Sequence, residues 1–206
     1  MTATVSAQPL HAHLGDPWRI AALLETPGAV CTGHYRLLAG QHSDRFVRFS
    51  QLAKNPEALS YFADLLAARM GPHDPAGVVA PSTAGVALGV EIARRLSARL
   101  YLASVGEDGR ANALIGVSPP EGARLLLVND VVTTGDGLRA LASVVGAAGA
   151  EVVGGAAFLC RSAMTLQDVE GVPLSLVATV PFESWSPSSC PLCQNDEEPE
   201  DARDLN

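Results

Sequence analysis

The chain has 206 residues, of which 48% are hydrophobic and 17% charged, a composition typical of a globular protein rather than a disordered one. Fourteen Lys and Arg against 22 Asp and Glu give a net charge of -8, and the sequence contains no cluster of basic residues. Because nucleic-acid binders usually carry a basic face, this charge argues against a nucleic-acid partner. The only lysine is Lys54, so an anionic ligand would have to be held by arginines, backbone N–H groups, hydroxyls or a metal.

The sequence shows no secretory signal and no clear membrane segment. Residues 1–13 contain neither the basic stretch nor the apolar stretch of a signal peptide, and we expect them to form a flexible N-terminus. The longest apolar run, 141–160, is long enough to span a bilayer, but Glu151 and several glycines interrupt it. We therefore expect a helix end, a cap at Gly149 and a buried strand there. With no sign of secretion, the four cysteines are expected to be reduced thiols in a cytoplasmic protein.

The first third of the chain predicts a helix, a pair of strands and a second helix. Asp16-Pro17 is typical of a helix start with Asp as the cap, and Thr26-Pro27-Gly28 is typical of its end. Residues 34–52 predict two strands joined by a polar turn at 40–43. Asn55-Pro56 then begins a second helix that carries apolar side chains along one face.

From Gly77 onward, short apolar strands alternate with helices. The predicted strands are 77–80, 99–104, a segment near Leu114, 124–128, 151–160 and 174–180, and the predicted helices are 86–96 and 138–149. Strands that alternate with helices imply right-handed crossovers and a parallel sheet, so the predicted fold class is α/β. Residues 195–206 carry many Asp and Glu, and we expect them to form an acidic disordered tail.

The segment LLLVNDVVTTGDG, residues 125–137, runs from a buried strand into a polar, glycine-rich turn. In a parallel sheet ligands bind at the carboxyl ends of the strands, so the residues after 125–128 are expected to lie in a ligand crevice. There Asp130 offers two acceptor oxygens that suit a pair of sugar hydroxyls, with Asn129 beside it. Residues 133–137 lead into a helix, whose free N–H groups suit a phosphate together with the threonine hydroxyls. This order of groups fits a ribose phosphate.

Other phosphate-binding loops fit the segment less well. The Walker A loop requires a lysine that the segment lacks, and the dinucleotide-binding fingerprint requires glycines where Asn129 and Asp130 stand. The remaining alternative is an ordinary strand-to-helix turn with Thr and Asp as caps. Because an acid, paired threonines and glycines coincide over so few positions, the phosphate-binding interpretation is favoured.

The same segment resembles the phosphoribosyl pyrophosphate signature of the type I phosphoribosyltransferases, and other segments point to the orotate phosphoribosyltransferases within that family. GHYRLLAGQHSDRF, residues 33–46, is similar to their N-terminal base-binding hairpin. VVAPSTAGVALGVEIARRL, residues 78–96, resembles their pyrophosphate loop and helix. FLCR, which ends at Arg161, stands where they carry a base-contacting arginine, and CPLC, residues 190–193, resembles one branch of them. The resemblance extends over most of residues 14–193.

The resemblance implies a type I phosphoribosyltransferase fold, with a central parallel sheet flanked by helices. The domain would span 14–194, and its small N-terminal hood would be formed mainly by 14–50. The implied reaction transfers phosphoribosyl from phosphoribosyl pyrophosphate (PRPP) to a nitrogen of an orotate-like base, as in pyrimidine biosynthesis, and releases pyrophosphate. The implied cofactor is Mg²⁺ and the implied assembly is a homodimer, with no nucleic-acid or membrane partner.

The resemblance also assigns roles to individual residues. Asp130 and Asn129 would hold the ribose hydroxyls, Asp130 would also face the metal, and Arg110 would be the remaining cation of the catalytic loop. The residues expected to bind PRPP are Val131, Val132, Thr133, Thr134, Gly135, Asp136, Gly137, Ser82, Thr83, Ala84 and Gly85. The residues expected to frame the base are Leu38, Ala39, Gly40, Phe46 and Arg161. The guanidinium of Arg161 suits a carboxylate or an imide edge.

The sequence departs from the family pattern at the positive charges that would surround pyrophosphate. Val105 stands where a basic residue is expected, Leu114-Ile115 where the related branch has a basic pair, and Leu38 where many orotate enzymes have a lysine. Asn129 also replaces the first of two acidic residues. A working transferase is therefore one hypothesis. The other is a catalytically weak homologue that binds a nucleotide or PRPP as a sensor or partner protein.

Two smaller patterns have structural interpretations that we favour. Cys190 and Cys193 have the spacing of a zinc knuckle, but they supply two of the four ligands that zinc requires, and the histidines are distant in sequence without paired spacing. A local turn is the favoured interpretation. His42 and Ser43 are adjacent on a predicted hairpin and would point to opposite faces, so they are not expected to relay a proton. His34 is expected to be a strand residue rather than a catalytic base.

Overall fold

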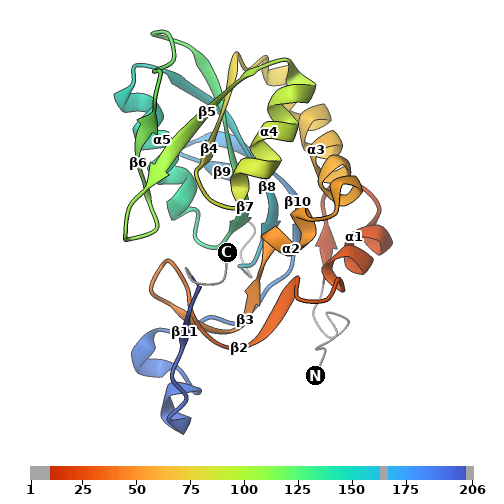
Figure 1. Cartoon of the computed structure of the whole chain (residues 1–206), viewed down its shortest axis with the longest axis vertical. Helices are drawn as coiled ribbons and strands as arrows, with labels where there is room; N and C mark the ends of the chain where they lie inside the picture. Colours follow the sequence, from red (N-terminus) through yellow and green to blue (C-terminus); the bar gives the residue numbers. More distant parts are fainter. Residues whose placement is uncertain (1–9, 163–166, 203–206) are drawn as a thin grey trace.

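The computed structural model describes residues 10–162 and 167–202, which form a large sheet covered by helices on both faces and a second, smaller sheet beside it (Figure 1). The strands of the large sheet follow the order β1-β10-β8-β7-β4-β5-β6, and β9 pairs with β10. Their bounds are β1 His11–Ala12, β4 Gly77–Pro81, β5 Arg99–Val105, β6 Ala111–Ile115, β7 Arg124–Val132, β8 Glu151–Cys160, β9 Asp168–Val169 and β10 Val172–Thr179.

The centre of the large sheet is parallel, as the alternation of strands and helices predicts. Strands β10, β8, β7, β4 and β5 pair in parallel, whereas β1 and β6 are antiparallel strands at its two edges. Residues 125–128 of β7 are completely buried between helices on both faces, which explains their uninterrupted apolar sequence. The α/β fold class is confirmed. No helix in the described part of the chain is long and apolar enough to cross a membrane.

Helices on the two faces of the sheet belong to two separate cores. One core combines helices α1 Pro17–Leu24, α2 Phe49–Ala53, α3 Pro56–Met70 and α4 Gly85–Leu96 with one face of the sheet. The other packs α5 Asp136–Ala147 against the opposite face. The predicted caps are confirmed: the Asp16 side chain accepts from the N–H of Trp18, and Asn55 accepts from the N–H groups of Glu57 and Ala58.

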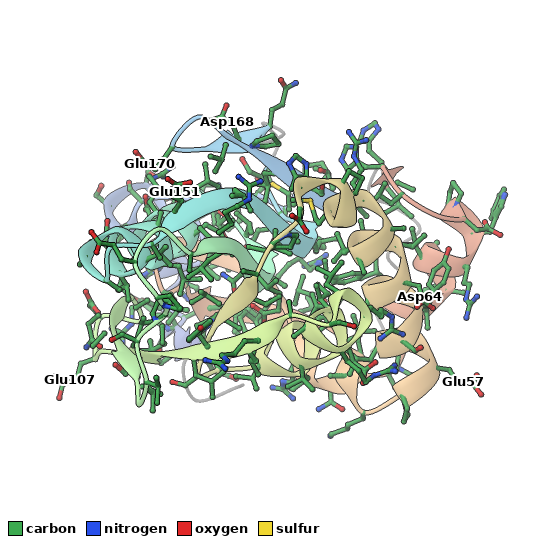
Figure 2. The ribbon with its side chains drawn as sticks, turned by 90° about the horizontal axis from the view of Figure 1, so that it is seen from above. Glu57, Asp64, Glu107, Glu151, Asp168 and Glu170 are labelled. Carbon is green, nitrogen blue, oxygen red and sulfur yellow. The ribbon has the colours of Figure 1, made fainter. Side chains whose placement is uncertain are left out.

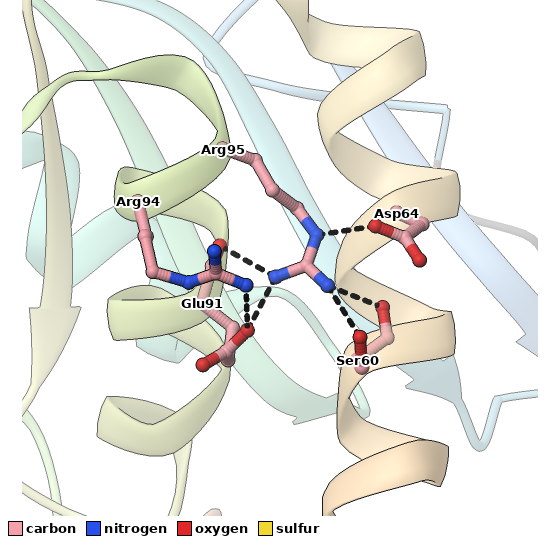
Figure 3. A network of polar contacts seen from close by, with 5 residues as sticks. All are labelled: Ser60, Asp64, Glu91, Arg94 and Arg95. Atoms are coloured by element: carbon pink, nitrogen blue, oxygen red, sulfur yellow. Dashed lines mark hydrogen bonds and ion pairs between the residues drawn. The ribbon is translucent and has the colours of Figure 1, made fainter.

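An arginine on α4 ties that helix to α3 (Figure 3). The Arg95 guanidinium donates to the Asp64 carboxylate at 2.5 Å and to the hydroxyl and carbonyl oxygens of Ser60 at 2.6 and 3.0 Å. It also pairs with Glu91 one turn earlier on α4. The Arg95 side chain is 13% exposed, whereas that of Arg94, which pairs with Glu91 from the solvent side, is 66% exposed. This network holds the C-terminal half of α4 against α3.

The smaller sheet, which we call the hood, contains β2 Val30–Arg36, β3 His42–Val47 and β11 Glu200–Asp201. Strands β2 and β3 form an antiparallel hairpin, and β11 pairs in parallel with β2 through Tyr35 and Arg36. In Figure 1 the hood lies below the large sheet, with the C-terminal segment against the hairpin. The core of the hood has four buried apolar residues, Tyr35, Leu37, Phe46 and Ala202.

The structure differs from the sequence prediction in the hood and at both ends of the chain. The second predicted strand ends at Val47 and is followed by helix α2, and the hairpin turn lies at 37–41 rather than 40–43. Residues 195–202 are not a disordered tail, because they include the end of a 3₁₀ turn (η4, Cys193–Asn195), strand β11 and the buried Ala202. Strand β1 lies inside the expected flexible N-terminus, whereas 1–9 and 203–206 lie outside the described residues.

Candidate functional site

A cavity of about 460 Å³ opens at the carboxyl ends of β4 and β7, between the large sheet and the hood. This is the place where an open parallel sheet binds its ligands. The hairpin turn forms one wall, the turn between β5 and β6 forms another, and the segment from the end of β7 to the start of α5 forms the floor. The lining therefore combines segments that are distant in sequence, from Leu37 to Ala202.

The floor of the cavity is the predicted phosphate-binding turn. Residues 133–137 follow β7, and Gly135 caps α5 with a φ of +86°, a conformation that favours glycine. The first N–H groups of α5 have no acceptor within the helix and lie at its positive end, which is suited to an anion. Thr134 donates its hydroxyl to Asp136 at 2.8 Å, and Arg139 donates to both the Asp136 carboxylate and the Thr134 carbonyl. These contacts within the turn and with Arg139 stabilise the shape of the turn without a ligand.

Asp136 supports the turn rather than the ligand. Hydrogen bonds from Arg139 and Thr134 lower the pKa of its carboxyl below the ordinary value, so it is ionised at neutral pH and already paired. Asp136 is therefore a poor candidate for holding a metal or a sugar hydroxyl.

Asp130 and Asn129 lie between the phosphate turn and the neighbouring loop of β4. The Asn129 side-chain oxygen accepts from the N–H of Asp130 at 3.0 Å, which fixes the orientation of the amide. Desolvation raises the pKa of the Asp130 carboxyl, although backbone N–H groups of Val131 and Asp130 act in the opposite direction. Of the three carboxylates that line the cavity in the described chain, Asp136 is paired with Arg139, whereas Asp130 and Asp108 have no cationic side chain paired with them. Asp130 is thus available to a hydroxyl or a cation.

A second helix start faces the cavity beside the first. Strand β4 is the immediate neighbour of β7, and residues 82–84 lead from β4 into α4 as 133–135 lead from β7 into α5. The two loops touch: a Cβ on Gly85 would lie 3.3 Å from the Asn129 side-chain oxygen. We call residues 82–85 and 129–137 together the cradle. It offers two adjacent helix N-termini with a carboxylate between them, which suits a ligand with two phosphate groups joined through a sugar.

The end of the cavity nearest the hood contains a buried cation. Arg161 is 3% exposed, lines the cavity just after β8 and donates to the Ser43 hydroxyl of the hairpin at 2.6 Å. Its Nε has no partner, and no carboxylate among the described residues lies within ion-pair distance of it. Burial lowers the pKa of Arg161 to about 10, partly offset by Asp44, so the guanidinium remains charged at neutral pH. A buried cation without an anion is costly unless a ligand supplies the counter-charge.

The turn between β5 and β6 closes the cavity against the hood. A Cβ on Gly109 would lie 2.8 Å from the Leu38 side chain, so this turn and the hairpin turn meet over the cavity. Arg110 lines the cavity here, and its charge contributes to the lowered pKa of Asp136 across the cavity. Val105 also lines the cavity. The position where the family pattern expects a basic residue therefore faces the space for the ligand.

The charges of the cavity do not by themselves suit a pyrophosphate. Its described lining holds two guanidiniums, Arg110 and Arg161, against three carboxylates, Asp108, Asp130 and Asp136. The acidic side chains labelled in Figure 2, Glu57, Asp64, Glu107, Glu151, Asp168 and Glu170, are all outside this lining. A highly anionic ligand would therefore require a further cation in the cavity.

Most residues that the sequence predicted for the site line this cavity. The exceptions are Gly40, Ala84 and Gly85. Gly40 has a φ of +80° in the hairpin turn, which explains the glycine without a ligand contact, and Gly85 is buried against Asn129. Lining residues that sequence reasoning did not assign to the site are Leu37, Val47, Pro81, Val105, Gly106, Asp108, Gly109, Ala111, Leu138 and Ala202. Ala202 had no sequence signal, because it reaches the cavity only through the pairing of β11 with β2.

Comparisons with known proteins agree with this geometry. The family described as "Phosphoribosyl transferase domain" matches residues 49–173, which is more than half of the chain. The orotate phosphoribosyltransferase of Desulforamulus reducens is 32% identical over 166 residues, covering 81% of this chain and 85% of that protein. The orotate phosphoribosyltransferase of Thermotoga maritima is 32% identical over 175 residues, covering 85% of this chain and 92% of that protein.

Solved structures show the same fold with different specificities. The orotate phosphoribosyltransferase of Aeropyrum pernix superposes with a TM-score of 0.63 at 27% identity, covering 78% of this chain and 93% of that one. An adenine phosphoribosyltransferase from Thermoanaerobacter pseudethanolicus superposes with a TM-score of 0.55 at 19% identity. The match covers 65% of this chain and 87% of that one. The fold is thus shared by proteins named for different bases, and the choice of base has to be argued from the hood side of the cavity.

Proposed function

The chain belongs to the phosphoribosyl transferase family, and on that premise we propose that it transfers phosphoribosyl from PRPP to a ring nitrogen of a carboxylate-bearing base of the orotate type. The observation that carries the choice of base is Arg161. It is a buried, charged guanidinium at the hood end of the cavity, with an unpartnered Nε and no carboxylate of the described chain paired with it. A planar base with a carboxylate would supply the missing counter-charge and accept two parallel hydrogen bonds.

The cradle supports the PRPP half of the proposal. The 5′-phosphate would bind at the N-terminus of α5 through residues 133–137, and the ribose hydroxyls would bind the Asp130 carboxylate. The pyrophosphate would extend toward residues 82–85 and Arg110, at the adjacent helix start. In this arrangement C1′ of the ribose would lie between the cradle and the hood and would face the base.

The reaction is a substitution at C1′. The base, as its nitrogen anion, attacks C1′ while the bond from C1′ to the pyrophosphate oxygen breaks, and pyrophosphate leaves with the bonding electrons. Positive charge develops on the ribose ring as that bond breaks, and the carboxylate of Asp130, which lines the cavity, would stabilise this charge. Asn129 is held by its bond to the Asp130 N–H and contributes no charge. Arg161 and the hairpin would orient the base for attack.

The residues present fit a magnesium ion. Mg²⁺ is usually held by one or two carboxylates together with substrate phosphates, and Asp130 offers a carboxylate without a competing cation at the point between the two helix starts. Asp130 would hold the ion together with oxygens of PRPP. When bound, the ion would neutralise charge on the departing pyrophosphate, which the two arginines of the described lining do not balance alone.

A second candidate function rests on the same imbalance of charge. Val105 occupies a cavity position where a basic side chain would face the pyrophosphate, and Leu38 occupies the hairpin position of a further lysine. A chain with an intact cradle and few cations could bind PRPP or a nucleotide tightly and turn it over slowly. In that case it would act as a sensor or a partner protein.

One experiment distinguishes these two functions. The protein is incubated with Mg²⁺, PRPP and one of orotate, uracil or adenine, and pyrophosphate release is measured alongside calorimetric binding of PRPP. Release that depends on orotate and is lost in Asp130→Ala supports the transferase. PRPP binding without release for any base supports the sensor, and the absence of both contradicts the two proposals. Light scattering on the same samples tests the expected homodimer.

A further inference from the structure

Four metal-ligating side chains converge on the hood, away from the cavity. His34 on β2, His42 on β3 and the two cysteines of the CPLC segment, Cys190 and Cys193, bring one nitrogen or sulfur atom each to within 4.8 Å of one another. We call these four residues the His–Cys cluster. His34, His42 and Cys190 are buried, and Cys193 is partly buried. The interpretation of CPLC as an isolated turn is therefore incomplete, because the fold brings two histidines to it.

The separations within the cluster are close to those of a tetrahedral zinc site. The Nε2 of His34 lies 2.9 Å from the Nδ1 of His42. The Sγ of Cys190 lies 3.4 Å from His34 Nε2, and the Sγ of Cys193 lies 3.7 Å from that atom and 3.2 Å from His42 Nδ1. With zinc–nitrogen bonds of about 2.0 Å and zinc–sulfur bonds of about 2.3 Å, tetrahedral geometry sets neighbouring ligand atoms about 3.3 to 3.8 Å apart.

The backbone around His34 holds its ring in the form that binds a metal. Its Nδ1 lies 2.7 Å from the carbonyl oxygen of Glu197, which can only accept, so Nδ1 carries the proton. In the neutral ring Nε2 then has its lone pair free and directed at the other three ligands. The register of β2 against β3 also shifts between Thr32 and Tyr35, and the consecutive residues His34 and Tyr35 are both buried. A bulge of this kind re-aims a side chain that regular alternation would place on the opposite face.

We propose that the His–Cys cluster binds one Zn²⁺ ion, which fastens the C-terminal segment to the hood hairpin. Two thiolates and two imidazoles in a closed, mostly buried arrangement are typical of a structural zinc site. Oxygen-preferring cations such as Mg²⁺ or Ca²⁺ find no carboxylate in the cluster. All four positions are taken by the protein, so the ion would not be catalytic.

The position of the cluster indicates what the ion would stabilise. His34 and Cys190 are 156 positions apart in the sequence, so the ion would close a long loop of chain. The same segment contacts the hairpin through the backbone pair of His42 with Trp185 and through β11. With four buried apolar residues in its own core, the hood has little else to order it. The hairpin carries Ser43, the partner of Arg161, so the ion would support the hood wall of the cavity from behind.

Metal content tests the proposal directly. The protein is purified with reduced thiols and without added metal, and zinc is measured by plasma mass spectrometry. We expect about one zinc per chain, falling at least about tenfold in Cys190→Ser and in Cys193→Ser. Cys31→Ser is the matched control: Cys31 lies on the same strand as His34, its sulfur bonds to the carbonyl of Gly28 and it is outside the cluster. Its zinc content should equal that of the unchanged protein.

Cobalt substitution of the unchanged protein keeps the proposal testable if the cysteine variants do not fold. After removal of zinc with a chelator, Co²⁺ is titrated in, and a tetrahedral site with two thiolates should give both thiolate charge-transfer absorption and intense visible bands at one ion per chain. Zn²⁺ should then displace Co²⁺. Failure of the reduced protein to bind either ion, zinc content unchanged in both cysteine variants, or a Cys190–Cys193 disulfide in freshly isolated protein would each overturn the proposal.

Hydrogen exchange shows where the ion acts. Removal of zinc should raise amide exchange at least about tenfold in the hairpin and in 185–202, and leave α5 and the phosphate turn unchanged. An equal rise across the large sheet would contradict a role confined to the hood. None of these measurements requires substrate or turnover, so their failure is separate from a failure of the proposed transferase activity.

Discussion

The two walls of the cavity are built in different ways. The cradle belongs to the large sheet: its loops follow β4 and β7, whose buried residues join the two extensive cores on either face. The hood has four buried apolar residues, and two of its strands are close in sequence while the third comes from the C-terminal end of the chain. The proposed phosphate site is therefore built from loops that directly follow two neighbouring strands, whereas the proposed base side is built from contacts between distant segments.

Because of this difference, we expect substitutions in the two walls to change different kinetic constants. If the proposed assignment holds, a change in the cradle should affect PRPP binding and the rate of bond breaking for every base, because the cradle would contact only the shared substrate. A change in the hood or at Arg161 should affect the base and leave PRPP binding nearly unchanged. The predictions below follow from this separation, starting with the largest expected effect.

Removal of the Asp130 carboxylate is expected to have the largest effect. In Asp130→Ala, kcat/KM for PRPP should fall about 100- to 1000-fold with any accepted base, since the group lost would stabilise charge that develops in the transition state. The measurement is steady-state pyrophosphate release with orotate. The matched control is Asp168→Ala, an exposed carboxylate on β9 outside the cavity, which should keep the activity of the unchanged chain. Activity near the original level in Asp130→Ala would contradict the cradle assignment.

The cradle was predictable from the sequence because its signal is local. A strand that is apolar at every position has to be covered on both faces, and the polar residues after it then lie at the edge where a parallel sheet binds ligands. Asp130 and residues 133–137 follow β7 directly, so their place in the cavity depends on one strand and one helix start. Ser82 and Thr83 were assigned to the site through the family resemblance, and they too follow their strand directly and line the cavity.

The hood was less predictable because its contacts join distant segments. Ala202 lines the cavity, and Cys190 and Cys193 meet two histidines, only because the C-terminal segment returns to the hairpin. The acidic composition of 195–206 favoured disorder, yet Arg36 pairs with Asp201 and Ala202 is buried among aromatic residues of the hairpin. Two histidines on either side of a hairpin turn have no fixed sequence spacing. The CPLC motif could therefore indicate only the two cysteine ligands of the cluster and not the two histidines.

Replacement of the buried arginine should produce the next largest effect, and it should be confined to the base. In Arg161→Gln, kcat/KM for orotate should fall about 10- to 100-fold, the value of a lost charge-assisted hydrogen bond, with little change in the KM for PRPP. The control is a substrate: uracil lacks the carboxylate, so activity with it should change much less. An equal loss for both bases would mean that Arg161 supports the hood and does not contact the carboxylate.

A gain of activity is expected where the chain departs from the family pattern. Val105 lines the cavity, so the lysine in Val105→Lys should face the pyrophosphate and raise kcat/KM for PRPP about tenfold by neutralising charge on the leaving group. Val117→Lys adds the same charge at an exposed valine just after β6, outside the cavity lining, and it should have no such effect. Equal activation by both lysines would indicate a general electrostatic effect on anion attraction and would contradict a specific clamp.

The smallest predicted effect concerns the contact between α3 and α4 and leaves activity unchanged. Arg95→Met removes the link from α4 to Asp64, Ser60 and Glu91, and we expect the free energy of unfolding at pH 7 to fall by about 1–3 kcal/mol. Arg94→Met removes the ion pair between Glu91 and the mostly exposed Arg94. It should change the free energy of unfolding by less than about 0.5 kcal/mol. The measurement is urea unfolding followed by circular dichroism.

The pH dependence identifies the charge that Arg95 stabilises. Hydrogen bonds from Arg95 and Arg94 lower the pKa of Glu91 in the folded protein below its ordinary value of 4.5. The folded state therefore binds the Glu91 proton less readily than the unfolded state, and the resulting stability is present above pH 4.5 and lost as the pH falls through the lower folded value. The difference between the unchanged protein and Arg95→Met should accordingly shrink on acidification below pH 4.5. If the difference in the free energy of unfolding stays constant with pH, the effect of Arg95 comes from packing and from its bonds with Ser60. The contact between α3 and α4 would then depend on these bonds rather than on the charge of Glu91.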